Sequence, residues 1–318
     1  MRYNNTVVAL VTGARGFIGR HLAISLHRKG IYVCGIGHGS WTESECVEWG
    51  LSQWLNGDVT KSNLEILQDS VGTPDIVFHL AGGSSVAPSI HAPVEDFRRS
   101  VLSTLELLEW ARVSAPKARL VLASSAAVYG SGYTHIIQET NPLRPYSPYG
   151  VHKRIAEELF ESYGKNFGLN VAFVRLFSVY GTEIRKQLLW DSCCRLANDS
   201  TALELGGSGK EVRDWFHVSD AVKLLRMAAT KANSEGFVIN GGTGDAVTVC
   251  QIARQLCTVW GMGTKLEFNG RGRQGDPQYL VADTTKASIL GFVPKVGWKE
   301  GLAYYVEWFK HVNLGGKI

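Results

Sequence analysis

Tyr149 and Lys153 are the residues whose types and spacing point most directly to chemistry. They stand four positions apart, and Ser147-Pro148 before them form a favourable N-cap and first-turn proline, which predicts both side chains on one face of a helix. A phenol has an ordinary pKa of about 10. A neighbouring ammonium favours the phenolate, so we expect Lys153 to lower the pKa of Tyr149 and to let it exchange a proton near neutral pH.

Two serines, Ser124 and Ser125, follow the apolar run at residues 120–123. The run predicts a buried strand, and ligands of parallel α/β sheets lie at the carboxyl ends of the strands. Ser125 is therefore the best candidate, with Ser124 next, to form a hydrogen bond with a reacting oxygen. We predict that Ser125, Tyr149 and Lys153 form one catalytic group.

A glycine-rich loop, TGARGFIG at residues 12–19, directly follows a predicted strand and precedes a predicted amphipathic helix. Gly13, Gly16 and Gly19 permit a tight turn, close approach of the backbone to a pyrophosphate, and close packing of helix on strand. The helix N-terminus offers unpaired N–H groups to phosphate oxygens. This pattern predicts a dinucleotide site, and Lys153 is expected to reach the nicotinamide ribose there.

The second predicted strand, residues 31–36, leads into GHGS with no carboxylate. An acid at this point would hold the adenosine ribose 2′-OH of NAD. Since it is missing, a 2′-phosphate would not be repelled, and His38, Ser40 and Arg15 could receive it. We therefore expect NADP as the preferred cofactor, with NAD as the alternative. Asp58, followed by Val59, is expected to contact the adenine edge.

Short apolar runs alternate with helical patterns in the first half of the chain, including a helix expected at residues 95–113. This alternation is typical of a Rossmann-type, doubly wound parallel α/β sheet with helices on both faces. We expect a dinucleotide-binding domain at residues 1–177, with residues 214–242 returning to it. A smaller α/β substrate domain is expected at residues 178–318, where glycine-rich turns become frequent.

The composition excludes several classes of protein. The 318 residues include 33 Lys and Arg against 29 Asp and Glu, a surplus of 33 − 29 = +4 that does not suggest binding to nucleic acid or a membrane surface. No apolar run is long enough to span a membrane, and the N-terminus lacks a signal-peptide pattern, so a cytoplasmic location is expected. The six cysteines form no C-x-x-C motif, which predicts free thiols and no metal site.

These motifs together resemble the extended short-chain dehydrogenases/reductases of the NAD-dependent epimerase/dehydratase family, which mostly act on nucleotide sugars. The similarity extends over nearly the whole chain, through TGARGFIG, GDVT, VFHLAG, SSAAVYG, YSPYGVHK, RLFSVYG, EVRDWFHVSDA, NGGTG and RQGDP…ADTTKA. It implies the catalytic triad Ser125, Tyr149 and Lys153. It also implies a cofactor site that, besides Tyr149 and Lys153, contains Gly13, Gly16, Phe17, Ile18, Gly19, Asp58, Val59, Leu80, Ala81 and Gly82.

The resemblance further implies a nucleotide-diphosphate sugar as the substrate. Arg213 and Arg273 match arginines that hold its pyrophosphate or ribose, and guanidinium groups suit two-pronged contacts with phosphate. The other expected substrate contacts are Ser84, Ser124, Ser125, Ser178 and Arg185. A homodimer is also implied, with the helices near residues 95–113 and 149–163 pairing between subunits.

The residues around the triad bear on which reaction is catalysed. Ala126 and Ala127 stand where the family's 4,6-dehydratases carry a threonine and an acid pair, which disfavours a dehydratase. Ser178 replaces an asparagine common in UDP-hexose 4-epimerases. With the missing acid after the second strand, this favours a reductase of 4-keto-6-deoxy nucleotide sugars, acting at C4. A UDP-hexose 4-epimerase is the alternative, and a non-catalytic cofactor-binding sensor or scaffold is a remote one.

Overall fold

The computed structural model describes residues 6–199, 201–261, 263–272 and 277–315. The chain forms two compact units. The first contains the described residues up to Gly130 together with Glu139–Leu176 and Val222–Asn240, and the second contains Ser131–Gln138, Phe177–Ala221 and the described residues from Gly241 onward. This division differs from the single boundary expected at residue 177, because residues 131–138 belong to the second unit.

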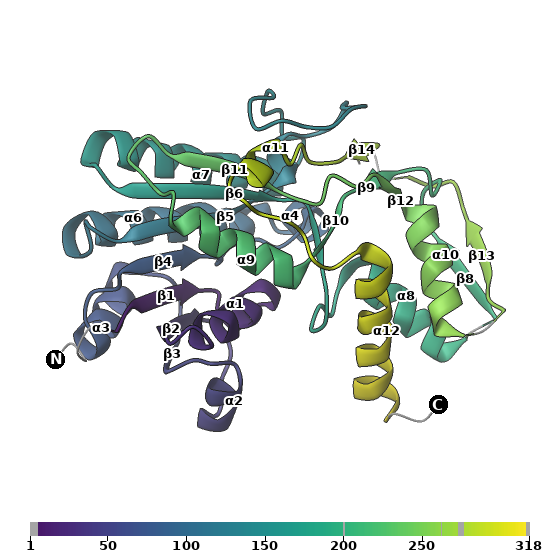
Figure 1. Cartoon of the computed structure of the whole chain (residues 1–318), viewed down its shortest axis with the longest axis horizontal. Coiled ribbons are helices and arrows are strands. Elements are labelled where there is room, and N and C mark those ends of the chain that lie inside the picture. The colour runs from purple at the N-terminus through teal and green to yellow at the C-terminus, as the bar shows by residue number, and fades with distance from the viewer. Residues whose placement is uncertain (1–5, 200, 262, 273–276, 316–318) are drawn as a thin grey trace. The chain divides into compact units, whose positions relative to one another are not determined.

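The first unit is built on a seven-stranded sheet with the order β11-β6-β5-β4-β1-β2-β3 (Figure 1). Strands β1 to β6 pair in parallel, and the winding direction reverses between β1 and β4. This confirms the predicted doubly wound sheet, in which ligands bind at the carboxyl ends of the strands beside such a reversal. The strands are β1 (Val8–Thr12), β2 (Tyr32–Gly37), β3 (Gln53–Asn56), β4 (Ile76–His79), β5 (Arg119–Ser125), β6 (Asn170–Leu176) and β11 (Phe237–Gly241).

Helices follow most of these strands. Helix α1 packs on β1 and β2, α3 packs on α6, and α7 packs on α6 and β5. Local sequence sets their ends: Thr60 caps α3, Ser147 caps α7, and α7 stops at Gly168, whose φ of 71° suits glycine. The helices are α1 (Phe17–His27), α2 (Glu43–Glu48), α3 (Lys61–Val71), α4 (Val86–His91), α5 (Pro93–Phe97), α6 (Ser103–Ser114) and α7 (Pro148–Phe167), with a 3₁₀ turn, η2 (Ala126–Val128).

The segment expected to be a helix, residues 95–113, is helical throughout but is not a single regular α-helix. A π-helical turn, η1 (Arg98–Leu102), separates α5 from α6. Ser103 Oγ and Thr104 Oγ1 donate hydrogen bonds to the backbone carbonyls of Arg99 and Ser100, a pattern that bends helices. Turns of this kind are frequent at functional sites, and Ser100 Oγ here accepts a hydrogen bond of 2.8 Å from Gly83 N, in the loop after β4.

The second unit contains several short sheets. Strands β7 and β10 pair in parallel, β8 pairs with β13, and β9 lies between β12 and β14. The buried carboxylate of Asp214, which follows β9, accepts hydrogen bonds from the backbone N–H groups of Thr243, Gly244 and Ala282. These bonds join the segment after β9 to the segments before β12 and after β14. The elements are β7 (Ser178–Tyr180), α8 (Gln187–Asn198), β8 (Ala202–Leu205), β9 (Val212–Arg213), β10 (Trp215–His217), α9 (Val218–Ala229), β12 (Val247–Thr248), α10 (Val249–Trp260), β13 (Lys265–Phe268), β14 (Tyr279–Leu280), α11 (Thr285–Ile289) and α12 (Trp298–Leu314).

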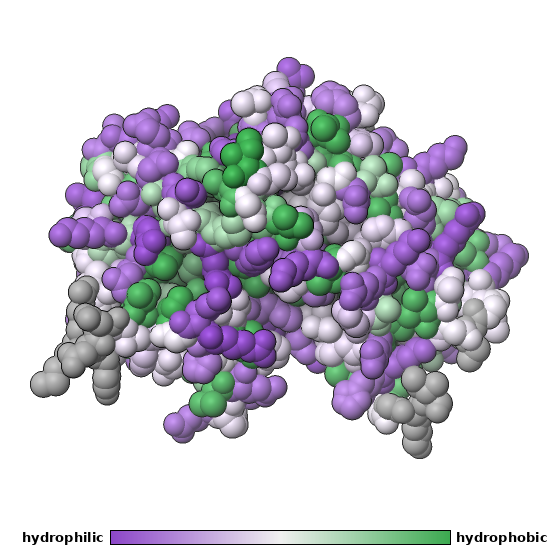
Figure 2. All heavy atoms as spheres, in the orientation of Figure 1, coloured by the Kyte–Doolittle hydropathy of each residue, from purple (hydrophilic) through white to green (hydrophobic). Residues whose placement is uncertain are grey.

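The core of the first unit is the apolar interior of its sheet. Leu10, Val77, Leu120 and Phe173 are buried there, and each such side chain stabilises the fold by roughly 1.5–3 kcal/mol relative to exposure. On the molecular face drawn in Figure 2, hydrophilic side chains are interspersed with small apolar groups. Within the described residues, no helix is both long and apolar enough to cross a membrane.

His79, the last residue of β4, is fully buried between two threonines. Its Nδ1 lies 2.8 Å from Thr12 Oγ1 and its Nε2 lies 3.0 Å from Thr104 Oγ1. Burial, with a smaller contribution from the positive charge of Lys153, lowers the pKa of His79 to about 3. The ring is therefore neutral in the folded protein and titrates near pH 6.5 only after unfolding.

We predict that this difference makes stability fall with acidification. Between pH 6.5 and pH 3, His79 binds a proton in the unfolded state but not in the folded state. The contribution of His79 to the free energy of unfolding therefore falls by about 2 kcal/mol from pH 7.5 to pH 5. Urea unfolding at both pH values measures it. In the variant His79→Gln this position does not titrate, so its free energy of unfolding should fall by about 2 kcal/mol less than that of the wild type over the same pH change. Equal losses in the two proteins would contradict the prediction.

Candidate functional site

The candidate catalytic residues meet where β5 ends and α7 begins. Ser125 is the last residue of β5, and Tyr149 and Lys153 lie in the first two turns of α7. Ser147 Oγ accepts a hydrogen bond of 3.2 Å from Gly150 N and so starts the helix. A Cβ atom on Gly150 would lie 2.6 Å from the carbonyl oxygen of Ala127, so glycine is required for α7 to close against the chain leaving β5.

This docking brings the three side chains together. The hydroxyl group of Ser125 lies close enough to the phenol of Tyr149 to act on its pKa, and Tyr149 N donates to Ser89 Oγ of α4 at 3.0 Å. Lys153 is only 5% exposed, and its Nζ donates to the carbonyl oxygen of Ala123 at 3.0 Å. The arrangement places a phenol, a hydroxyl and an amine at the carboxyl end of β5, as the sequence analysis expected.

The expected effect of Lys153 on Tyr149 is wrong for this structure. Burial raises the pKa of Tyr149, the hydrogen bond from Ser125 acts in the opposite direction, and the charge of Asp96 raises it further. Burial lowers the pKa of Lys153 to about 8, against the opposing effects of Asp96 and Glu157. Desolvation therefore dominates both groups, and the phenol is protonated at neutral pH.

The glycine loop lies at the carboxyl ends of β1 and β4. Gly13 has φ of 69°, and a Cβ on it would lie 2.9 Å from Ala81 N. A Cβ on Gly19 would collide with the carbonyl oxygen of Gly13. Thr12 Oγ1 accepts hydrogen bonds from Leu80 N at 3.2 Å and Ala81 N at 3.1 Å, which fixes the chain after β4 beside the loop.

The start of α1 fits a dinucleotide pyrophosphate. Gly16 is the N-cap residue of α1, and no side chain caps the helix there. The first turn also contains no acidic residue. The N–H groups of Phe17, Ile18 and Gly19 can therefore donate to a phosphate. Gly82, whose φ is 143°, follows Ala81, and a Cβ on it would lie 3.4 Å from Lys153 Nζ. The expected cofactor residues of β1 and β4 thus lie along one path toward Lys153.

A carboxylate does reach the end of β2, from a neighbouring strand. Asp58, just after β3, places Oδ1 2.9 Å from His38 Nε2, and both side chains are exposed. The guanidinium of Arg15 lies directly against Gly39 in the same segment, so close that a Cβ atom on Gly39 would collide with it. Ser40 is exposed there, whereas the Val59 side chain is buried in the core and leaves only its backbone for a ligand.

The expected substrate residues divide between the two units. Ser84 is exposed after β4, but Ser124 is 3% exposed and donates its hydroxyl to Glu157, so its expected contact with substrate is corrected. In the second unit Ser178 begins β7 and Arg213 ends β9. Arg273 lies outside the described residues.

Arg185 has aromatic and acidic neighbours in the second unit. Its guanidinium lies 5.9 Å from the ring of Trp190 and 5.7 Å from that of Trp308. Its Nη2 is 3.8 Å from Glu183 Oε2. The side chain remains about half exposed, so Arg185 presents a charge that the two indoles restrain.

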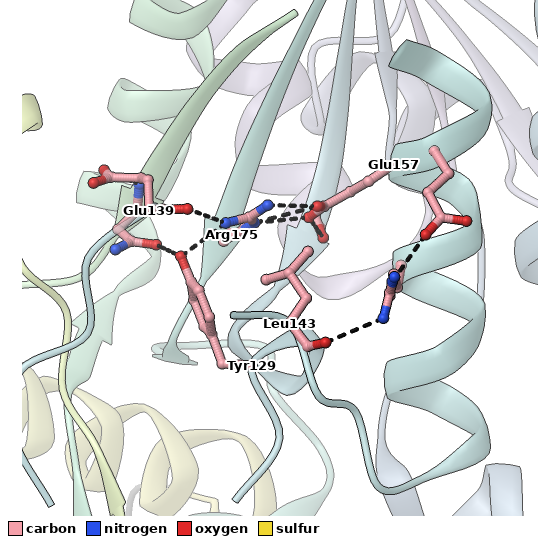
Figure 3. A network of polar contacts seen from close by, with 9 residues as sticks. Tyr129, Glu139, Leu143, Glu157 and Arg175 are labelled. Carbon is pink, nitrogen blue, oxygen red and sulfur yellow. Dashed lines mark hydrogen bonds and ion pairs between the residues drawn. The ribbon is translucent and has the colours of Figure 1, made fainter. Parts of the chain in front are cut away.

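Sequence reasoning missed a buried polar network behind Ser124. Figure 3 shows Arg175 directed toward Glu157 on one side and toward Tyr129 and the Glu139 carbonyl on the other. The Arg175–Glu157 ion pair has an Nη2–Oε2 distance of 2.8 Å, and Arg175 Nη1 donates to Tyr129 Oη at 3.1 Å. Two signals were present: Glu157 stands one helical turn after Lys153, and Arg175 interrupts the apolar run of β6.

Neither metal nor disulfide chemistry is suggested by the described part of the chain. No cluster of three or more His, Cys, Asp or Glu residues in it could hold a metal ion. The six cysteines are free thiols.

Comparison with known proteins agrees with this dinucleotide-binding α/β architecture. Residues 9–242 match the model of the "NAD dependent epimerase/dehydratase family". The chain is 29% identical over 314 residues to the UDP-glucose 4-epimerase of Azospirillum brasilense, with coverage of 92% of this chain and 89% of the relative.

Solved structures agree over almost the whole chain. MoeE5 in complex with UDP-glucuronic acid and NAD is 33% identical with a TM-score of 0.84, covering 96% of this chain and 99% of that one. The UDP-glucose 4-epimerase of Thermotoga maritima with UDP-glucose is 28% identical with a TM-score of 0.87, at the same coverage. The fold and the comparisons define an NAD(P)-dependent enzyme that acts on nucleotide sugars. The chain belongs to the NAD-dependent epimerase/dehydratase family, which confirms the resemblance noted from its motifs.

We predict that Gly19→Ala weakens cofactor binding, because the added methyl group collides with Gly13 O and opens the turn. The affinity for NAD(H) should fall at least about tenfold, roughly 1.4 kcal/mol. Fluorescence titration of the reduced cofactor measures it. Gly263→Ala is the matched control, since its Cβ meets no atom within 4 Å. An unchanged affinity in Gly19→Ala would place the pyrophosphate elsewhere.

Proposed function

We propose that this protein is a nucleotide-sugar 4-epimerase acting on a UDP-hexose. The observation that carries the proposal is the grouping of the Ser125 hydroxyl and the Tyr149 phenol with Lys153, adjoining a turn suited to a dinucleotide. Full-length similarity to UDP-sugar 4-epimerases supports this reaction over the 4-keto-6-deoxy reductase favoured by the sequence analysis. One argument for the reductase, the missing carboxylate after β2, is weakened by Asp58 at that point.

The chemistry requires a group that takes and returns one proton. Epimerisation at C4 removes the hydroxyl proton and the C4 hydride, leaving a ketone, and then returns both with the opposite configuration; a bound nicotinamide supplies hydride acceptance and return. Tyr149 is the proposed proton carrier: in its phenolate form it takes the C4 hydroxyl proton, and the phenol so formed returns a proton to the ketone oxygen when the hydride comes back. Ser125 holds the sugar oxygen near the phenol, and Lys153, protonated below pH about 8, binds the nicotinamide ribose in this proposal.

The proposed substrate contacts follow from the charge of the side chains and from the family motifs in which they stand. The guanidinium groups of Arg213 and Arg185, and Arg273 by its sequence motif, suit the two phosphates of a nucleotide diphosphate. Ser84 and Ser178 supply hydroxyl groups for the sugar. MoeE5 binds UDP-glucuronic acid and UDP-glucose, which supports testing both acidic and neutral hexoses.

We predict interconversion of C4 epimers without added cofactor. The purified protein is incubated with UDP-glucose, UDP-galactose and UDP-glucuronic acid, and the products are followed by NMR. Tyr149→Phe should lose about 10²- to 10⁴-fold in kcat while retaining cofactor, because proton transfer is removed. Tyr304→Phe, an exposed tyrosine bonded to Glu300, is the control and should keep full activity. Turnover of a 4-keto-6-deoxy sugar alone, with stoichiometric NADPH consumption, would instead establish the reductase.

We further propose that the site accepts NADP in preference to NAD, as the sequence analysis expected, with Arg15 as the main contact of the 2′-phosphate. The guanidinium of Arg15 lies over Gly39 and 5.8 Å from the Trp41 ring. Asp58 stands opposite with a carboxylate, but its side chain is 74% exposed, so solvent screens its repulsion of a 2′-phosphate. A relative crystallised with NAD is the competing indication.

Arg15→Gln tests the preference. The wild type should bind NADPH more tightly than NADH, and the variant should lose about tenfold in NADPH affinity, consistent with a charge-assisted hydrogen bond, while NADH affinity stays unchanged. Titration of the cofactor-stripped protein measures both constants. Tighter binding of NADH by the wild type would overturn the proposal and leave the epimerase assignment intact.

Two further expectations stay predictions. A homodimer through α5, α6 and α7 is supported by exposed apolar side chains on the helices there, among them Val94, Phe97, Leu102, Leu105 and Val151. The cytoplasmic location expected from the sequence is the other.

A further inference from the structure

We propose that Asp96, held by His152, is a positioning residue of this site: its carboxylate sets the proton balance of Tyr149 and Lys153 and seats the Gly82–Gly83 turn. The inference rests on the proposed catalytic role of that pair. It adds to the site a charged residue from α5 that neither the motifs nor the comparisons single out.

Asp96 and His152 form a buried pair. Asp96 Oδ2 lies 2.6 Å from His152 Nδ1, and the two side chains are 6% and 11% exposed. His152 directly precedes Lys153 in α7, and Phe97 packs edge-on against its ring. The pair therefore fixes α5 to the turn of α7 that carries Lys153.

The other carboxylate oxygen of Asp96 faces the loop after β4. A Cβ on Gly83 would collide with Asp96 Oδ1, so the loop backbone passes directly over this oxygen. Ser100 Oγ accepts the Gly83 N–H at 2.8 Å, and a Cβ on Gly82 would lie 3.4 Å from Lys153 Nζ. One carboxylate thus touches both the histidine next to Lys153 and the loop that passes Lys153.

The charge of Asp96 acts on both reacting groups in the same direction. It raises the pKa of Tyr149 and opposes the lowering of the Lys153 pKa by burial. The carboxylate therefore keeps the amine charged and the phenol protonated. The titratable or charged groups on the elements packed against α5 are His91 of α4, Arg98 and Arg99 of η1, and, at the start of α7, Tyr149, His152, Lys153 and Arg154.

Asp96→Asn tests the inference, because it removes the charge and keeps the shape and a hydrogen-bonding oxygen for His152. Glu95→Gln is the matched control: the same chemical change on the neighbouring residue of α5, which is exposed and paired with Arg99. The first readout needs no substrate. Each protein and its Tyr149→Phe version are titrated to alkaline pH, and the difference between their ultraviolet absorbances gives the phenolate signal of Tyr149. Circular dichroism, recorded over the same pH range, shows where the protein unfolds.

We expect the Tyr149 phenolate in Asp96→Asn to form at a pH about one unit lower than in the wild type, as loss of a nearby like charge requires. Glu95→Gln should match the wild type. The second readout is the pH profile of kcat/KM, whose alkaline limb should move to lower pH by a similar amount because Lys153 loses its proton earlier. If Asp96→Asn does not fold, Asp96→Ser, smaller and also uncharged, is expected to give the same shifts.

The two readouts separate this inference from the proposed function. If the wild type epimerises no UDP-hexose, the function fails, and the phenolate titration still decides the role of Asp96. If the wild type turns over but neither the phenolate signal nor the alkaline limb moves beyond that of Glu95→Gln, Asp96 is only a packing residue and the inference is overturned.

Discussion

The site depends on the close docking of α7 against the chain that leaves β5. Only glycine at position 150 lets the first turn of the helix approach Ala127, and that approach is what allows the hydroxyl groups of Tyr149 and Ser125 to meet. The hydrogen bond from Lys153 to Ala123 holds the next turn of the helix to the same strand. Because these groups stand on a helix and a strand, their geometry is held by the fold's core.

Buried charge around this contact is balanced locally. Behind it, Glu157 is paired with Arg175 and accepts a hydrogen bond from the Ser124 hydroxyl, and on the other side the Asp96 carboxylate contacts His152 Nδ1. Removing one partner of the Arg175–Glu157 pair would cost roughly 3–5 kcal/mol, because the other charge would be left buried and uncompensated. The two pairs therefore stabilise the position of α7 and set the potential at Lys153 and Tyr149.

Local patterns in the sequence were sufficient for the parallel sheet, the glycine turn and the Tyr149–Lys153 spacing, because each depends on neighbours within one strand–turn–helix segment. Pairings between distant segments were not predictable in this way. The Asp58–His38 contact joins the ends of two strands, and the Asp96–His152 contact joins α5 to α7. The sign of the Tyr149 pKa shift was missed because spacing reveals a nearby amine but not the burial that outweighs it.

The central claim is that Tyr149 moves the C4 hydroxyl proton while the C4 hydrogen is stored within the protein. Incubation with UDP-glucose deuterated at C4, followed by NMR of the UDP-galactose formed, tests it most directly. We expect the deuterium to remain at C4 of the product, without exchange into water. Product that carries hydrogen from the solvent at C4 would contradict the claim.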